Sequence, residues 1–350
     1  MISLLSNYRK EASTAAVSGW QRFWFLPRDP ATLCVLRICI GLLLLYTHAV
    51  WTLDWDGFFG PAGWLDKTAR AAPFAPPPGE APSIFARWQW SHFDWIESQA
   101  VLWTLHWVAL GIFTLLVLGL FSRTAAVLSW LIAVSYTQRN PQAMFGLDGI
   151  NTMLAMYLWI GPCGDWYSID AWLRRRKESY QMAGQGRGDA PPVRPIELSI
   201  TANISIRLIQ LHMCLIYLFS AIGKLQGESW ASGVALWGAV ANREYQSMDA
   251  TWLAAYPLVI SILTHLTVMW ELTYPVLVWP RLWRPLVLAM AVGVHLGIGL
   301  WMGMMSFGLA MIVGNMAFVE SYYVRTILGG RASLVPASVK STLGARGRTT

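Results

Sequence analysis

Long apolar runs alternate with short polar segments along most of the chain. A helix of about 20 apolar residues crosses a bilayer core, and fewer are enough where neighbouring helices bury it. We predict eight such helices, at 31–53, 100–121, 125–136, 150–160, 204–222, 257–278, 286–301 and 307–319. The third and fourth are short, so they either extend into neighbouring residues or re-enter the membrane. Gly303 and the Met-rich turn around it predict a break between the last two.

These runs divide the chain into an N-terminal cytoplasmic amphipathic segment (1–30), a transmembrane domain (31–320) and a basic cytoplasmic tail (321–350). The fold class is therefore all-α, a polytopic integral membrane protein with interfacial helices. The loop 54–99 is rich in Trp and Pro, and its "APPPGEAP" stretch predicts an extended piece. Its tryptophans form either an aromatic belt at the membrane surface or a lid over a pocket. Residues 178–203 are predicted to be a flexible linker.

Composition supports the membrane interpretation. Of the 350 residues, 55% are hydrophobic and 13% are charged, whereas soluble domains contain about 25% charged residues. If the N-terminus is cytoplasmic, most arginines and lysines fall on the cytoplasmic side of the eight helices, as the positive-inside rule requires. The net charge of +7 is thus an orientation signal, not a sign of nucleic-acid binding. Both termini are predicted to be cytoplasmic, with the cytoplasmic membrane of a bacterium as the expected location.

Signatures of soluble enzymes are missing from the sequence. It contains no GxSxG, P-loop, HExxH or Rossmann glycine pattern. The four cysteines lie in or beside apolar segments and form no CxxC pair, so we expect neither a disulfide framework nor a zinc site. No metal is predicted.

Ionisable residues inside membrane helices are costly and are therefore functional candidates. Glu271 and His295 lie on the sixth and seventh predicted helices at similar depth, towards the middle or the inner half, so each is a candidate partner for the other. Lys224 lies in the outer half, where it is either a side chain that extends to the interface or a reactive amine. Arg37 and Arg207, near cytoplasmic helix ends, are interpreted as side chains that extend to the interface.

Two more charged residues lie in the apolar stretch "TQRNPQAMFGLDGINTM" on the predicted outer side. Asn-Pro and Gly-Leu-Asp-Gly favour turns there. Arg139 and Asp148 either pair with each other or line an outer pocket, and the sequence leaves both interpretations open.

A set of motifs follows in a fixed order: "RFWFLPRDPATLCVLRICIGLLL", "GFFGPAGWL", "QRNPQAMFGLDG", "GDWYSIDAW", "LIQLHMCLIYLFSAIGKLQGESWASGVAL", "MWELTYPVL" and "VHLGIGLWMGMMSFGLAMIVGNMAF". Their order and spacing resemble the HTTM family, whose membrane domain is shared with vitamin K-dependent gamma-glutamyl carboxylase. The resemblance covers most of residues 20–320.

The resemblance implies that Lys224 is a general base that deprotonates a lipid quinol, a reduced naphthoquinone, before reaction with oxygen. It also implies supporting roles for His295 and Glu271 and a position for Trp230 near the lysine. The candidate cofactor-binding residues are Trp230 together with Arg139 and Asp148, the latter two as residues that line an outer pocket. Two departures are evident. "FGLDGI" stands where the carboxylase has an Asn-His pair, with Asp148 as the candidate replacement. The large lumenal region that binds the carboxylase's protein substrate has no counterpart.

Two classes of function follow from these observations. The first is an enzyme with an outward-facing pocket around Lys224 and carboxylase-like or oxygenase-like chemistry on a lipid quinol. The second is a proton-coupled transporter or a non-catalytic partner in a membrane complex. Transport would depend on Glu271 and His295 and would tolerate the loss of Lys224. The expected partners are the lipid bilayer and the lipid quinol. The sequence does not identify a protein partner.

Overall fold

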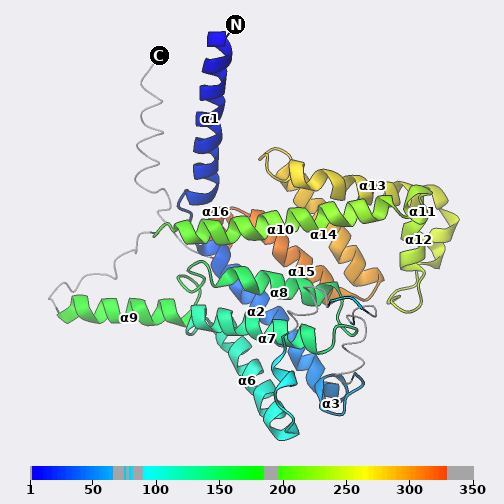
Figure 1. The fold of residues 1–350 in the computed structure, drawn as a ribbon, viewed down its shortest axis with the longest axis horizontal. Helices are drawn as coiled ribbons and strands as arrows, with labels where there is room; N and C mark the ends of the chain where they lie inside the picture. The colour runs from blue at the N-terminus through cyan, green and yellow to red at the C-terminus, as the bar shows by residue number, and fades with distance from the viewer. Residues whose placement is uncertain (1, 66–74, 76–78, 82–89, 185–195, 329–350) are drawn as a thin grey trace.

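The computed structural model describes residues 2–65, 75, 79–81, 90–184 and 196–328, and this part of the chain is all-helical (Figure 1). Each of the eight predicted hydrophobic segments forms a helix. In chain order these are α2 (Ala31–Trp51), α6 (Gln99–Leu118), α7 (Ser122–Arg139), α8 (Gly146–Leu158), α10 (Ile200–Leu225), α13 (Pro257–Leu277), α14 (Arg284–Trp301) and α15 (Met305–Asn315). The two short predictions, now α7 and α8, extend into neighbouring residues. The predicted break is present too, because Gly303 has a φ of +69° between α14 and α15.

In the described part of the chain, fewer helices have the length and hydropathy of a membrane span than the eight that the sequence predicts. Among the described residues, four segments are long and apolar enough to cross a membrane: Ala31–Phe59, Gln99–Leu118, Ile200–Leu225 and Arg284–Trp301. A fifth is added if Met305–Phe318 and Ser321–Ile327, bent by 114°, count as one span. The 13 residues of α8 and the 11 of α15 reach only about 20 Å and about 17 Å at 1.5 Å per residue. Each of these two helices is therefore too short to cross a bilayer core of about 30 Å by itself.

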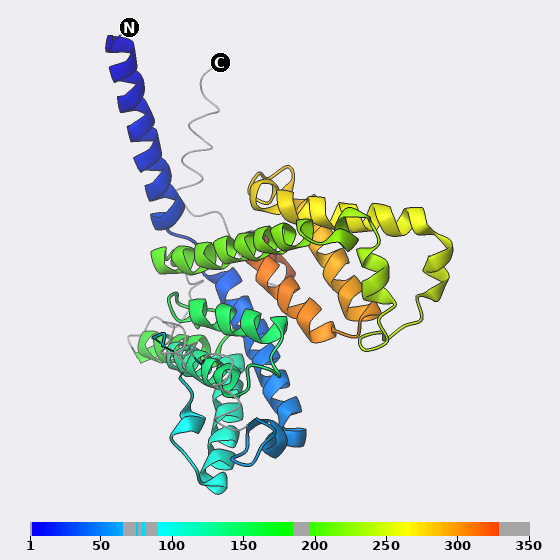
Figure 2. The same ribbon diagram turned by 45° about the vertical axis from the view of Figure 1, so that its right-hand side comes forward.

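The long helices form two groups that share one core. Helices α2, α6, α7 and α8 pack together, and α10 packs against α13 while α14 packs against α15. Contacts of α15 with α2 and α8, and of α10 with α8, join the groups. Figures 1 and 2 show α2 (blue) running between α6 and α7 on one side and α10 with α13 to α15 on the other. Side chains from both groups contribute to one hydrophobic cluster, so the described bundle has a common core.

The remaining helices lie outside this bundle. Helix α1 (Ile2–Phe25) projects from it beside the start of α10 (Figure 1). Helix α9 (Ile169–Gly184) extends from the other group and occupies part of the segment predicted as a linker. That prediction is wrong for 178–184, because the helix of α9 continues there, and for 200–203, where α10 has begun. Residues 185–195 lie outside the described residues, as do residues 329–350 of the predicted tail.

Short helices fill the connections. They are η1 (Thr52–Asp54), α3 (Trp55–Phe59), η3 (His92–Asp94), α11 (Glu228–Ala231), α12 (Ala235–Val240), η4 (Thr251–Ala255), η5 (Met316–Phe318) and α16 (Ser321–Ile327). In the loop 54–99, Trp55 and Phe59 are buried against Phe93 and Tyr136. The described part of the loop thus forms a second apolar cluster. Half of its "APPPGEAP" stretch lies outside the described residues.

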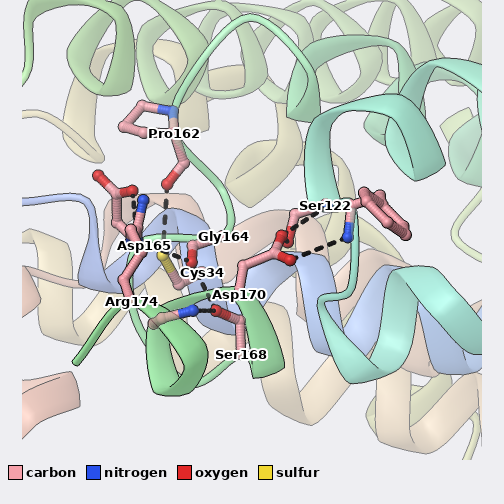
Figure 3. Close-up of polar contacts among 10 residues, drawn as sticks. Cys34, Ser122, Pro162, Gly164, Asp165, Ser168, Asp170 and Arg174 are labelled. Carbon is pink, nitrogen blue, oxygen red and sulfur yellow. Dashed lines mark hydrogen bonds and ion pairs between the residues drawn. The ribbon is translucent and has the colours of Figure 1, made fainter. Parts of the chain in front are cut away.

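The "GDWYSIDAW" motif (residues 164–172) links the start of α9 to the start of α7 through Asp170 (Figure 3). The Asp170 carboxylate accepts hydrogen bonds from the backbone N–H groups of Phe121 and Ser122, at 3.0 and 2.8 Å, and from the Ser122 hydroxyl at 2.7 Å. It therefore satisfies free N–H groups in the first turn of α7, where a negative charge is also favoured by the helix dipole. Nearby, the Cys34 thiol donates to the Pro162 carbonyl at 3.6 Å. Arg174 pairs with Asp165 at 3.0 Å.

Arg37 does not extend to the interface as predicted, because its side chain is fully buried. Its guanidinium donates to the carbonyls of Leu116, Val117 and Tyr167 at 2.7, 3.1 and 2.6 Å. The first two carbonyls belong to the last turn of α6, and the Leu116 carbonyl also accepts from the N–H of Gly119 at 3.2 Å. Gly119 ends α6 with a φ of +69°, and a Cβ there would collide with Arg37 and Ser168. Arg37 is thus a buried cap for α6.

Candidate functional site

Lys224 and Glu271 form an ion pair between α10 and α13. The Lys224 Nζ lies 2.9 Å from Oε1 and 2.7 Å from Oε2 of Glu271, and it also donates to the Ser220 hydroxyl. The side chains are 20% and 9% exposed. A charge placed this deep is tolerated only when it is paired and hydrogen-bonded. Each of the two charges therefore has its counter-charge within hydrogen-bonding distance.

Helix periodicity explains how α10 presents this amine. Ser220 is four residues before Lys224, and Tyr217 is seven residues before it, so all three lie on one face of α10. Lys224 also lies in the last turn of α10, where the helix dipole favours a cation. On the far side of the amine, its Nζ lies 5.2 Å from the centre of the Trp230 ring, a cation–π contact. Trp230 thus lies beside the amine, while its predicted contact with the quinol stays a prediction.

The ion-pair partner of Glu271 is Lys224 and not His295, the candidate partner suggested by their similar depth. The sequence places Lys224 in the outer half of the membrane and Glu271 nearer the middle or the inner half, so it does not predict their contact. In the structure, the chain after α10 folds back onto the first half of α13, where the Leu236 N–H donates to the Thr264 hydroxyl at 3.2 Å. Helix α13 therefore extends beyond α10, and Lys224 lies level with Glu271.

His295 is buried on α14 and has a fixed tautomer. Its Nδ1 lies 2.7 Å from the carbonyl oxygen of Ala291, and a carbonyl only accepts, so Nδ1 carries the proton. In the neutral imidazole Nε2 is then an acceptor. The His295 ring lies 5.8 Å from the ring of Tyr217, centre to centre. His295 thus lies near the ion pair, and its Nε2 can accept a hydrogen bond from a ligand.

A hydrogen-bond network supports the wall beneath these groups. Asn315 donates to the Tyr217 hydroxyl at 2.8 Å, and its oxygen accepts from the Tyr274 hydroxyl at 2.7 Å. Both tyrosine rings are buried. The network joins α10, α13 and α15 and leaves the proton of the Tyr217 hydroxyl available to a further acceptor.

These residues surround a cavity of about 460 Å³, which we call the lysine cavity. Its polar lining is formed by Lys224, Glu271, His295, Ser220, Tyr217 and His212. Its apolar lining is formed by Ile150, Met153, Ile216, Ile298, Phe307 and Met311. An apolar cavity with a few convergent polar groups is the usual form of a small-molecule site.

A second cavity of about 590 Å³ adjoins the first and shares Gly149, Met153 and His212 with it. Its other walls are mainly apolar, with Trp130, Met144, Phe145 and Met156. Asp148 lines this second cavity, and its carboxylate accepts from the backbone N–H of Phe145 at 3.1 Å to close the first turn of α8. Asp148 is thus both a helix cap and a cavity residue.

Arg139 has a different position. Its guanidinium donates to the carbonyls of Phe59, Gly60 and Leu65 at 3.4, 2.8 and 2.8 Å. These carbonyls belong to the loop after α3, so Arg139 anchors that loop to α7. Arg139 is not among the residues found to line the two cavities in the described part of the chain. The structure therefore groups Lys224, Glu271, His295 and Trp230, places Asp148 next door, and places Arg139 elsewhere.

Sequence reasoning did not single out Ser220, Tyr217 or Asn315. The first two carry a recognisable signal, because their spacing from Lys224 puts three polar side chains on one face of an apolar helix. Asn315 carries a weaker one, a single amide in an apolar run. Comparison with protein-family models, with curated proteins and with solved structures finds no match to the chain. The HTTM resemblance therefore stays a prediction that rests on the ordered motifs.

Proposed function

We propose that this protein is an HTTM-type enzyme of a bacterial cytoplasmic membrane that uses a lipid quinol in the lysine cavity. In this proposal all eight hydrophobic helices lie within the membrane, and both termini are cytoplasmic. The observation that carries the proposal is the ion pair of Lys224 with Glu271, which opens onto an apolar cavity beside the imidazole of His295. The ordered motifs of the sequence support the same assignment.

The cavity fits a quinol headgroup by size and by chemistry. Its volume of about 460 Å³ lies within the range of about 300–1,000 Å³ typical of ligand sites. Phe307 and Ile150 offer apolar surface to an aromatic ring, while Lys224 and His295 offer partners to its hydroxyls. The adjoining cavity, with Trp130 and Met156 in its walls, can hold part of an isoprenoid tail.

Lys224 must lose a proton before it can act as a base, and Glu271 is placed to receive it. The Nζ lies 2.7 Å from the nearer carboxylate oxygen, so the proton can pass from the ammonium to the carboxylate within an existing hydrogen bond. The amine then has a lone pair that can accept the proton of a hydroxyl in the cavity. The Nε2 of His295 can accept a hydrogen bond from a second hydroxyl and so orient the ligand.

A bound quinol supplies two electrons and two protons, and dioxygen is the proposed oxidant. The chain's own contribution is to hold the hydroxyl near Lys224, to take up its proton and to limit access of water through the apolar lining.

The test is oxidation of a reduced naphthoquinone by the purified protein in nanodiscs with dioxygen present, followed by chromatography of the products. We expect turnover above the spontaneous rate, with at least a tenfold loss in Lys224→Met. The double variant Lys224→Met/Glu271→Leu removes the base without leaving a lone buried charge, which separates chemistry from folding. The control is Lys177→Met, which removes an exposed lysine of α9. Equal oxidation rates in the wild type, the double variant and the control contradict the proposal.

A further inference from the structure

A separate cavity of about 450 Å³ lies at the opposite end of α10 from Lys224. It is formed where the segment after α1, the start of α10, the turn between α13 and α14, and α16 come together (Figure 1). Five arginines and two carboxylates line it, an excess of three positive charges: Arg28, Arg207, Arg281, Arg284, Arg325, Asp29 and Glu320. We call it the arginine cavity.

The two carboxylates are already paired with three of the arginines. Arg325 donates to both oxygens of Asp29 at 2.7 Å, a two-pronged contact, and its guanidinium stacks on Trp166 at 3.9 Å from the ring centre. Glu320 lies 3.4 Å from Arg281 and 3.3 Å from Arg284. Arg28 and Arg207 therefore have no ion-pair partner in the described part of the cavity.

Arg207 is held by uncharged groups. It donates to the side-chain oxygen of Gln210 at 3.0 Å and to the carbonyl of Phe23 at 3.3 Å, and it stacks on the Phe23 ring at 4.3 Å. These contacts fix the direction of the guanidinium without neutralising it. Arg207, which the sequence interpreted as a side chain extending to the interface, is thus built into the cavity wall.

Arg28 is the least satisfied of the five. Its backbone pairs with Ser199, but in the described structure its guanidinium has neither a hydrogen bond nor an ion pair. Burial, and then the charge of Arg207, lowers the pKa of Arg28 to about 10, so it stays charged at neutral pH. A half-buried, charged guanidinium without a protein partner still has its N–H donors available to a ligand.

We propose that the arginine cavity binds a phosphate group through Arg28 and Arg207. Guanidinium groups match the oxygens of a phosphate in a two-pronged geometry. Apolar side chains also line the cavity, among them Leu26, Trp279, Phe318 and Tyr322. Basic pockets between membrane helices bind anionic lipid headgroups in this way. The phosphate belongs either to an anionic phospholipid or to a soluble phosphate compound.

The experiment measures thermal unfolding of the full chain under three conditions. These are nanodiscs of phosphatidylcholine alone, the same nanodiscs with phosphatidylglycerol, and phosphatidylcholine nanodiscs with inorganic phosphate. We expect one or both anions to raise the melting temperature of the wild type. Stabilisation by phosphatidylglycerol alone assigns a lipid headgroup, and stabilisation by inorganic phosphate assigns a soluble ligand.

The variant Arg28→Gln carries the test, because the side chain it removes makes no hydrogen bond that the fold needs. We expect at least a tenfold weaker apparent affinity for the stabilising anion, with Arg28→Lys intermediate. The matched control is Arg174→Gln, which removes a largely exposed arginine on α9 outside the cavity. No stabilisation of the wild type by either anion overturns the proposal, as does an equal loss of affinity in the two glutamine variants.

Discussion

The ion pair of Lys224 and Glu271 makes the most direct prediction about stability. Replacing Glu271 by Leu leaves the ammonium without its counter-charge among apolar side chains, and Lys224→Met leaves the carboxylate in the same state. Breaking a buried ion pair from one side costs about 3–5 kcal/mol. The side chain of Lys224 is 20% exposed, so water relieves part of the penalty. We therefore expect the lower end, about 3 kcal/mol, for each single variant.

The double variant Lys224→Met/Glu271→Leu removes both charges together. Well-packed apolar replacements of a buried pair are often neutral or stabilising, so we expect it to lie within about 1 kcal/mol of the wild type. Glu271→Gln keeps one oxygen that accepts a hydrogen bond from the Lys224 Nζ. Its free energy of unfolding should therefore lie between those of the wild type and Glu271→Leu. If the two residues act as a pair, the double variant should lose much less stability than the sum of the losses in the two single variants.

The assay is unfolding of the purified protein in mixed micelles by increasing sodium dodecyl sulfate, followed by tryptophan fluorescence. Lys177→Met is the control and should change the unfolding free energy by less than about 0.5 kcal/mol. Single variants that cost less than about 1 kcal/mol, with a double variant equal to their sum, refute the reasoning. In that case the two charges are hydrated and independent.

Three further predictions concern residues outside the lysine cavity. Burial lowers the pKa of His92 from 6.5 to about 4, so the unfolded chain binds more protons between these values and the melting temperature should fall as pH drops from about 6.5 to about 4; His92→Gln should flatten this fall. Gly119→Ala, which drives a Cβ into Arg37 at a left-handed φ, should destabilise the fold by about 2 kcal/mol in the same unfolding assay. Asp170→Ala, which removes the cap of α7, should cost about 1–2 kcal/mol, while Asp170→Asn, which keeps one acceptor oxygen, should cost less.

The sequence predicts the helices well because hydrophobic periodicity is a local property. All eight apolar segments are helices in the structure, and Gly303 breaks the chain where its lack of a side chain suggested. The number of spans is a different question, because it depends on length and on what surrounds each helix. Helix α8 is a clear example: it is apolar, yet its 13 residues are too few to cross a bilayer core without help.

The candidate site was predictable in its residues but not in its pairing. Lys224, Glu271 and His295 were selected because ionisable groups in apolar helices need partners. Which partner each takes depends on how far α13 extends past α10, and this is fixed by the fold-back of residues 228–240, which carries no periodic signal. Arg37 shows the same limit. Its position near a helix end suggested contact with water, but the carbonyls at the end of α6 satisfy it inside the protein.

The two cavities differ in how completely the protein neutralises its own charges, and this difference predicts the kind of ligand for each. In the lysine cavity the ammonium of Lys224 faces both oxygens of Glu271, so a charged ligand would have to displace an existing partner. A neutral molecule with hydroxyl groups can instead bond to His295 and to the ion pair without separating charges. In the arginine cavity, Arg28 and Arg207 have no ion-pair partner in the described structure, and an anion completes what the fold leaves open. The pairing of charges within each cavity thus favours a neutral ligand at one end of α10 and a phosphate at the other.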